Sequence, residues 1–153
     1  MTMYLIQFTL ALFATAGFSV IFRVPTKHIP ACMVIGALGW VTYEVITINN
    51  FSPALGCFFG ACMVGLLSNF AAHTFKDAAT IFIIPGILCL VPGYAIFNTM
   101  LYMLQEDFTA SAEIGMQTLM MAGAIALGLL IIGAVLRVFY ALIRKTVTLR
   151  DKF

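Results

Sequence analysis

The sequence predicts an all-α integral membrane protein with five transmembrane helices, built as a single domain over residues 1–153. Two observations support this class. Of the 153 residues, 63% are hydrophobic and 9% are charged, with a mean hydropathy of +1.08, whereas about a quarter of an average soluble domain is charged. Charged and turn-forming residues also divide the chain into five apolar stretches, each close to or above the length of about 20 residues that a spanning helix needs. This composition excludes a disordered chain, a coiled coil and a soluble enzyme domain.

Turn residues delimit the first three spans, which are expected at residues 4–22, 31–48 and 54–75. No charged residue precedes Arg23, so the first stretch is too long for the apolar core of a signal peptide and is expected to be retained. Pro25 and Pro30 resist helix continuation in the loop that follows. Ser52 and Pro53 are typical of an N-cap and a first helical position, so they predict the start of the third span.

The fourth and fifth spans are expected at residues 78–104 and 114–142. A polar turn precedes the fourth span. An acidic loop that includes Glu106, Asp107 and Glu113 separates the fourth span from the fifth. The fifth span is longer than a bilayer requires.

The basic residues set the expected orientation. All eight fall on one side of a five-span arrangement: Arg23, Lys27, Lys76, Arg137, Arg144, Lys145, Arg150 and Lys152. The positive-inside rule then predicts an outer N-terminus and an inner C-terminus in a bacterial inner (plasma) membrane. An odd number of spans cannot hold two inverted halves, so this chain is expected to supply one repeat and a partner of opposite orientation the other.

The fourth span carries two Pro-Gly pairs, Pro85-Gly86 and Pro92-Gly93. Each proline removes a backbone donor and clashes with the preceding turn, while each glycine adds backbone freedom. Broken backbone at membrane depth is tolerated only where protein covers it or where it lines a wet cavity. Because half-helix ends present N–H groups to anions, these four residues are predicted to bind substrate beside a discontinuous helix.

Polar side chains inside the spans extend this candidate site. Tyr94 and Asn98 follow the second pair and share a helical face, so they are expected to contact substrate. Glu44 is a carboxylate within an apolar segment and is a candidate for proton or cation coupling, although a hydrated interfacial position is the alternative. Asn69 and His73 are candidates for an inner vestibule, with an interhelical hydrogen bond as the alternative.

Other residues indicate packing. The four cysteines lie in apolar runs without metal-binding spacing, and Gln7 is expected to pair with a neighbouring helix. Small residues, including Gly60, Gly123, Gly128 and Gly133, predict close helix contacts. No motif indicates a catalytic residue, a metal or a cofactor, and none is expected.

Three segments carry a resemblance to a known family: Arg23-Val-Pro25, Gly36-Ala-Leu-Gly39-Trp40 and Pro85-Gly-x5-Pro92-Gly93. Across about residues 13–135 the chain resembles the threonine/serine exporter (ThrE-type) family, and within it the small YjjB-like subunit. The resemblance implies secondary export of small hydrophilic amino acids. It also implies a larger companion subunit with five spans and a cytoplasmic N-terminal domain, and the export of dicarboxylates such as succinate by some members.

These observations lead to one main expectation. The chain is expected to be a membrane subunit of a secondary exporter for threonine- or serine-like amino acids, working with the companion subunit by alternating access, and not an enzyme. Two alternatives remain open, namely an exporter subunit for a dicarboxylate such as succinate and a non-transporting scaffold or channel-like subunit. The expected partners are the substrate, the companion and lipid. A net charge of +2 gives no indication of nucleic-acid binding.

Overall fold

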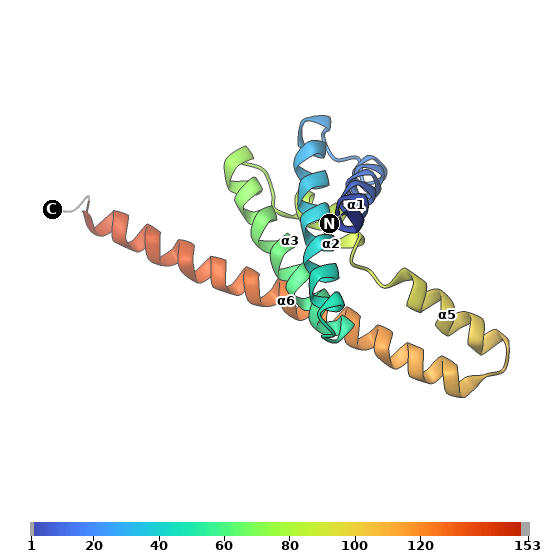
Figure 1. Cartoon of the computed structure of the whole chain (residues 1–153). Helices are drawn as coiled ribbons and strands as arrows, with labels where there is room; N and C mark the ends of the chain where they lie inside the picture. The colour runs from blue at the N-terminus through green and yellow to red at the C-terminus, as the bar shows by residue number, and fades with distance from the viewer. Residues whose placement is uncertain (1, 151–153) are drawn as a thin grey trace.

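The computed structural model describes the backbone of residues 2–150 and the side chains of residues 5–139. The described chain is helical throughout, joined by short turns (Figure 1). The elements in chain order are α1 (Thr2–Ile21), η1 (Thr26–His28), α2 (Ile29–Ile48), α3 (Pro53–Phe75), α4 (Thr80–Leu88), α5 (Gly93–Leu104) and α6 (Phe108–Arg150). The predicted all-α class is therefore confirmed.

The predicted start of the third helix is confirmed at its cap. Ser52 Oγ accepts a hydrogen bond from the backbone N–H of Leu55 at 3.4 Å, and Pro53 is the first residue of α3. The second helix begins at Ile29, before the predicted residue 31, because Pro30 lies in the first turn, where a missing N–H breaks no helical bond.

The fourth predicted span is broken once. The prediction of a discontinuity at both Pro-Gly pairs is wrong at the first pair, because Pro85 lies inside α4 and the helix continues through it to Leu88. The chain then leaves the helix, and α5 starts at Gly93, directly after Pro92. The axes of α4 and α5 are bent by 52°.

The last helix is longer than predicted at both ends. It starts at Phe108, because Asp107 Oδ1 accepts a hydrogen bond from the Ala110 N–H at 3.1 Å and so begins the helix. Glu113, predicted in the loop, is therefore in α6. The tail charges Asp151 and Lys152 lie outside the described residues, as do the side chains of three further basic residues, Arg144, Lys145 and Arg150.

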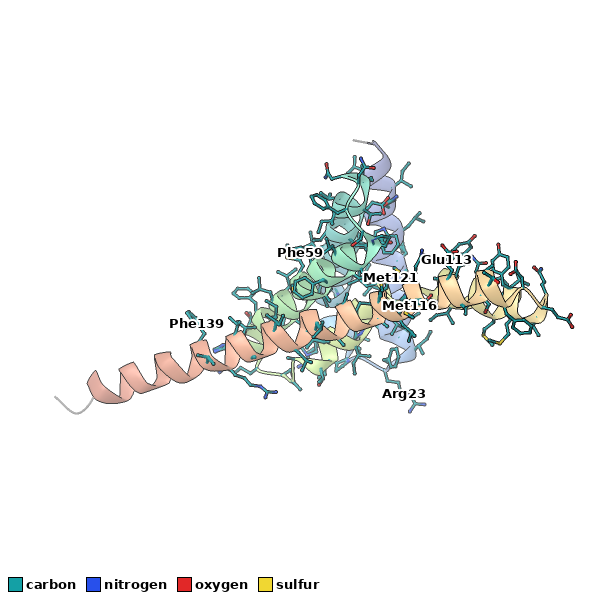
Figure 2. All side chains as sticks on the ribbon, turned by 90° about the horizontal axis from the view of Figure 1, so that it is seen from below. Arg23, Phe59, Glu113, Met116, Met121 and Phe139 are labelled. Carbon is teal, nitrogen blue, oxygen red and sulfur yellow. The ribbon has the colours of Figure 1, made fainter. Side chains whose placement is uncertain are left out.

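The helices form a bundle with a projecting arm. Helix α2 packs between α1 and α3, α4 packs against all three, and α6 crosses α3. Helix α5 runs back along the first part of α6, and the two extend away from the bundle as a hairpin (Figure 1). Figure 2 shows Glu113 on this arm and Met121 closer to the bundle.

Close helix contacts occur at some of the predicted glycines. A Cβ atom added at Gly60 would lie 3.0 Å from the Gly39 carbonyl oxygen, and one added at Gly128 would lie 2.7 Å from the Phe58 carbonyl oxygen. These two glycines let α3 approach α2 and α6. Gly123 and Gly133 make no such contact within the described chain, because a Cβ at either would meet none of its other atoms within 4 Å.

Within the described residues, three helices are long and apolar enough to cross a membrane, at Thr26–Ile48, Pro53–Phe75 and Phe108–Phe139. The bent pair α4 and α5 makes a fourth if it is one span. The apolar stretch of α1 among the described side chains, Leu5–Ile21, is shorter. These helices agree with a multi-pass membrane protein.

Candidate functional site

The break between α4 and α5 is the irregular backbone of the fourth predicted span. Three short bonds hold it, namely Leu90 N–H to the Ile87 carbonyl at 2.9 Å, Val91 N–H to Leu88 at 3.3 Å, and Gly93 N–H to Val91 at 2.7 Å. Proline at position 92 has no N–H with which to continue the α4 ladder. The chain therefore changes direction here while most of its backbone groups keep partners.

Cysteine thiols contact one carbonyl oxygen in the first turn of α4 and one in the break itself. The helical partner of the Ile81 carbonyl would be residue 85, a proline, and the thiol of Cys32 donates to this carbonyl instead at 3.7 Å. The thiol of Cys57 lies 4.0 Å from the Leu90 carbonyl oxygen. Thiols are weak donors, so they partly satisfy these oxygens without charge. Sequence reasoning had placed these cysteines only as small apolar side chains.

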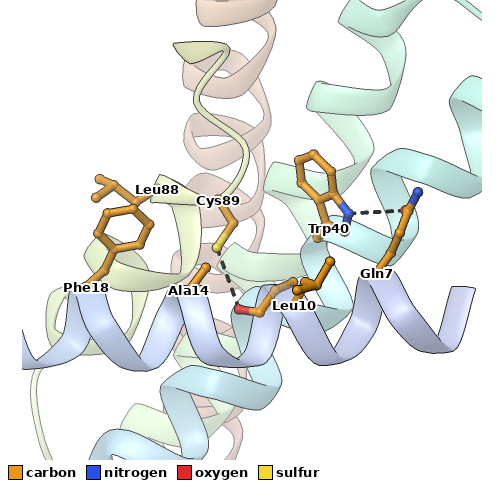
Figure 3. Close-up of a pocket in the computed structure, with 8 residues that line it drawn as sticks. Gln7, Leu10, Ala14, Phe18, Trp40, Leu88 and Cys89 are labelled. Atoms are coloured by element: carbon orange, nitrogen blue, oxygen red, sulfur yellow. Dashed lines mark hydrogen bonds between the residues drawn. The ribbon is translucent and has the colours of Figure 1, made fainter. Parts of the chain in front are cut away.

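One hollow, the α1 hollow, lies between α1 and the end of α4 (Figure 3). Its volume is about 390 Å³, within the usual range of about 300–1,000 Å³ for ligand pockets. The Cys89 thiol is 3.1 Å from Thr15 Oγ1 and 3.9 Å from the Ala11 carbonyl oxygen, so it joins the break to α1. The hollow is lined by Gln7, Leu10, Ala11, Ala14, Phe18, Trp40, Leu88 and Cys89.

A second hollow, the α5 hollow, lies where the arm leaves the bundle. Its volume is about 520 Å³. It is lined by Trp40, Tyr43, Pro53, Cys89, Leu90, Val91, Pro92, Gly93, Tyr94, Ala95 and Met121. Trp40 and Cys89 line both hollows, so these two spaces flank the broken backbone. Among the described side chains, no charged group lines either hollow, and the polar groups there are an amide, an indole, a thiol and two phenols.

Two hydrogen bonds connect Glu44 to the α1 hollow. The Gln7 side-chain Nε2 donates to Glu44 Oε1 at 2.9 Å, and Trp40 Nε1 donates to Gln7 Oε1 at 3.3 Å. Figure 3 shows the indole and the amide facing each other across α1 and α2. The prediction that Gln7 pairs with a neighbouring helix is confirmed. Glu44 does not line the hollow itself. It is connected to the hollow only by its hydrogen bond with Gln7, which does line it.

The structure divides the six predicted substrate-binding residues between separate places. Pro92, Gly93 and Tyr94 line the α5 hollow, and Tyr94 is 81% exposed. Asn98 is half-buried one turn further along α5. Gly86 is buried, and a Cβ there would lie 3.1 Å from the Val64 side chain.

Pro85 lies in a third space, the loop hollow, of about 260 Å³. It is formed by the α1–α2 loop and the first turns of α4, with Phe22, Arg23, Val24, Pro25, Thr80, Ile81, Ile84 and Pro85. The two Pro-Gly pairs therefore face different surroundings, since only the second pair lines the space beside the break.

The two vestibule candidates lie toward the end of α3. Asn69 donates from its side-chain Nδ2 to the Gly65 carbonyl oxygen at 2.8 Å, which is a bond within its own helix. It also lines a hollow of about 320 Å³ with Leu136 of α6. His73 is exposed. Among the described residues, no group of three or more His, Cys, Asp or Glu side chains is arranged to hold a metal ion.

The comparisons with known proteins agree with the resemblance. A family model described as "Threonine/Serine exporter, ThrE" matches residues 7–135 of the chain. An uncharacterised protein of Haemophilus influenzae is 29% identical over 89 residues. The matched stretch covers 58% of this chain and 30% of the relative, so the chain spans under a third of that relative's length. No solved structure matches the chain.

Proposed function

Since the chain belongs to the threonine/serine exporter (ThrE) family, we propose that it is a membrane subunit that moves small amino acids through the space beside its broken helix. The observation that carries this proposal is the break at residues 89–92 with a hollow on either side. Transporters place substrate where helices are discontinuous, because the half-helix ends there offer free backbone groups. In the first turn of α5 the amides of Gly93 and Ile96 donate to the carbonyls of Val91 and Pro92. Those of Tyr94 and Ala95 have no partner within their own helix, and both residues line the α5 hollow.

The proposal includes five spans. Helices α4 and α5 have 9 and 12 residues, so at about 1.5 Å per residue they extend about 32 Å together. This length suits a hydrocarbon core of about 30 Å. Helix α1 has 20 residues and extends about 30 Å by the same arithmetic. Both lengths support one crossing by α1 and one by the bent pair.

The orientation remains the one that the charges predict, with an inner C-terminus. Lys27 Nζ lies 3.4 Å from Asp77 Oδ2, so the α1–α2 and α3–α4 loops share one end of the bundle. These loops carry Arg23, Lys27 and Lys76, which supports a single basic side facing the inside of a bacterial inner membrane. Fusing a reporter that is active only inside, and one that is active only outside, to the C-terminus tests this orientation.

The proposed partner is a companion subunit with five spans of the opposite orientation and a cytoplasmic N-terminal domain. The arm formed by α5 and the start of α6 supports a partner, since its apolar side chains are exposed on the isolated chain, including Phe97, Met100 and Met116. With the companion in place, the two subunits alternate access around the broken helix. Copurification of the full chain with a protein of that description tests this part.

The lining of the two hollows favours an amino acid over a dicarboxylate. A dicarboxylate carries two negative charges that need cationic or multiple N–H partners. Both hollows are lined by uncharged side chains. A zwitterion with no net charge suits such a lining better, because its two charges attract each other as well as the backbone groups.

The test is a pair of glycine substitutions in cells that also make the companion. Gly93→Leu is expected to abolish export of threonine and serine, because the new side chain enters the α5 hollow. A Cβ at Gly93 meets no atom of the described part of the chain within 4 Å, so folding is expected to survive. Gly17→Leu is the matched control, since Gly17 is also open and lines neither hollow. Normal export by a normally expressed Gly93→Leu protein would contradict the proposal.

A further inference from the structure

Trp40 stands between the two hollows that flank the break. It lines the α1 hollow together with Gln7 and Cys89, and it lines the α5 hollow together with Tyr43. Its ring centroid is 5.3 Å from that of Tyr43, at an interplanar angle of 38°. The side chain is only half-buried. The indole therefore borders both spaces.

Two hydrogen bonds fix the position of this ring, and their chemistry determines the direction of each. The indole N–H can only donate, and an ionised carboxylate can only accept. Gln7 lies between them, with its amide nitrogen toward Glu44 and its amide oxygen toward Trp40. With an acceptor on one side and a donor on the other, only this orientation of the amide satisfies both neighbours.

From this arrangement we infer that the Gln7 side chain holds the Trp40 ring in place between the two hollows and that the ring can move when this bond breaks; we call the Gln7–Trp40 bond the latch. Glu44 is a positioning residue, because its bond to Gln7 keeps the amide oxygen directed at the indole. Without an acceptor at position 44 the amide is free to turn. The bond from the indole N–H is then the amide's one remaining restraint, so the amide oxygen holds the ring less firmly. Glu44 thus acts on the Trp40 ring through Gln7 and does not touch the hollow itself.

The consequence for transport rests on the proposed function. Substrate that moves past the break passes from one hollow to the other, and the indole lies on that path. When the ring is latched the hollows are separate, and when it swings they join. Loss of one neutral hydrogen bond shifts the ratio of latched to released positions by about fivefold. Release of the Trp40 ring from Gln7 is therefore expected to alter access of substrate to the hollows without altering the fold.

The chain contains one tryptophan, so fluorescence excited selectively at tryptophan reports on Trp40 alone. The test uses the purified full chain in detergent micelles and measures the emission maximum and quenching by acrylamide. Gln7→Leu and Glu44→Leu are both expected to shift the emission maximum and to raise the quenching constant. Glu44→Gln is expected to stay close to the parent, since its amide oxygen still accepts from Gln7.

The matched control is Gln117→Leu, which makes the same chemical change at an exposed position on α6 outside both hollows. It is expected to leave the fluorescence unchanged. If Gln7→Leu fails to fold, as judged by gel filtration, Glu44→Leu carries the test. Unchanged emission and quenching in the folded variants would overturn the latch, as would an equal change in Gln117→Leu.

The fluorescence result is independent of export, which separates the two proposals. If the variants move the fluorescence signal but the parent chain, made together with the companion, exports neither threonine nor serine, the latch is supported and the proposed function is contradicted. An unmoved signal in a chain that exports normally contradicts the latch alone. Where both hold, Gln7→Leu is expected to change the export rate while Gln117→Leu leaves it unchanged.

Discussion

His28 Nε2 lies 2.7 Å from Asp77 Oδ2, and this contact joins the α1–α2 loop to the α3–α4 loop. The imidazole is fully buried, with the rings of Phe75 and Phe82 edge-on to it at centroid distances of 5.0 and 5.2 Å. Asp77 can only accept when ionised, so Nε2 carries the hydrogen. The pair sets one end of the bundle and thereby the start of α4, which leads into the break.

The Asp77 contact predicts a stability that depends on pH. The hydrogen bond from His28 is the main cause that lowers the pKa of Asp77, with Lys27 contributing further. A lowered pKa in the folded state adds stability above the ordinary value of about 3.9, and this is lost as the pH falls through the lowered value. Asp77→Asn is therefore expected to lower Tm at pH 7, and the difference from the parent narrows below about pH 4.

Thermal unfolding of the full chain in detergent, followed across pH, checks this prediction. Glu113→Gln is a suitable control, because it removes an exposed carboxylate on the arm. Equal Tm values for the parent and Asp77→Asn at pH 7 would show that the loop contact contributes nothing.

The close contact of α3 with α6 at Gly128 predicts that alanine substitutions at two glycines of α6 have different effects on stability. Gly128→Ala is expected to destabilise the chain by about 1–3 kcal/mol, because its Cβ would lie 2.7 Å from the backbone carbonyl of Phe58. Gly123→Ala on the same helix meets no neighbour and is expected to leave Tm equal or higher, since alanine is the better helix former. Denaturation of both variants side by side measures the difference, and a reversed order would place the α3–α6 contact elsewhere.

Much of the architecture was predictable because composition and helix-ending residues act locally. The cap at Ser52 and the loops near Pro25 and Asn50 follow from backbone preferences of single residues. The two Pro-Gly pairs show the limit of this reasoning. They are alike in sequence, yet α4 continues through Pro85 where a thiol meets the freed carbonyl, and ends before Pro92.

The parts of the candidate site that escaped prediction depend on pairs of residues far apart in the chain. Gln7 and Glu44 are 37 residues apart, and Cys89 and Thr15 are 74 apart. No local pattern marks such pairs. A signal did exist for α1, since Gln7, Thr15 and Ser19 recur at multiples of four and so share one helical face. That spacing indicates the side of α1 that faces protein.

Glu44 also remains a candidate for coupling to protons, and one substitution separates this role from positioning. Glu44→Gln keeps an acceptor for Gln7 but cannot titrate. We expect it to retain the fluorescence of Trp40 and to lose the stimulation of export by a proton gradient. Export from loaded vesicles with and without the gradient measures this. If a proton gradient still stimulates export by the Glu44→Gln variant, Glu44 does not couple protons and keeps the positioning role alone.

The cysteines provide a test of the packing around the break. Cys32 and Cys57 are fully buried, whereas Cys89 is half-buried and lines both hollows. In variants that keep one cysteine each, a small thiosulfonate reagent is expected to modify Cys89 readily and the other two slowly. Mass spectrometry of the intact chain measures the extent of reaction. Equal rates at all three positions would contradict the arrangement of α4 against α2 and α3.

The same reaction at Cys89 tests the central proposal most directly, because this residue lies at the broken backbone. The measurement is the rate of modification in membranes that hold the full chain and the companion, with and without added substrate. Threonine and serine are expected to slow the reaction at Cys89, whereas succinate is expected to have little effect. In the control, a variant whose one cysteine is introduced by Gly17→Cys, the rate of modification is expected to be the same with and without substrate. Unchanged modification of Cys89 at threonine concentrations that saturate export would contradict a substrate site beside the broken helix.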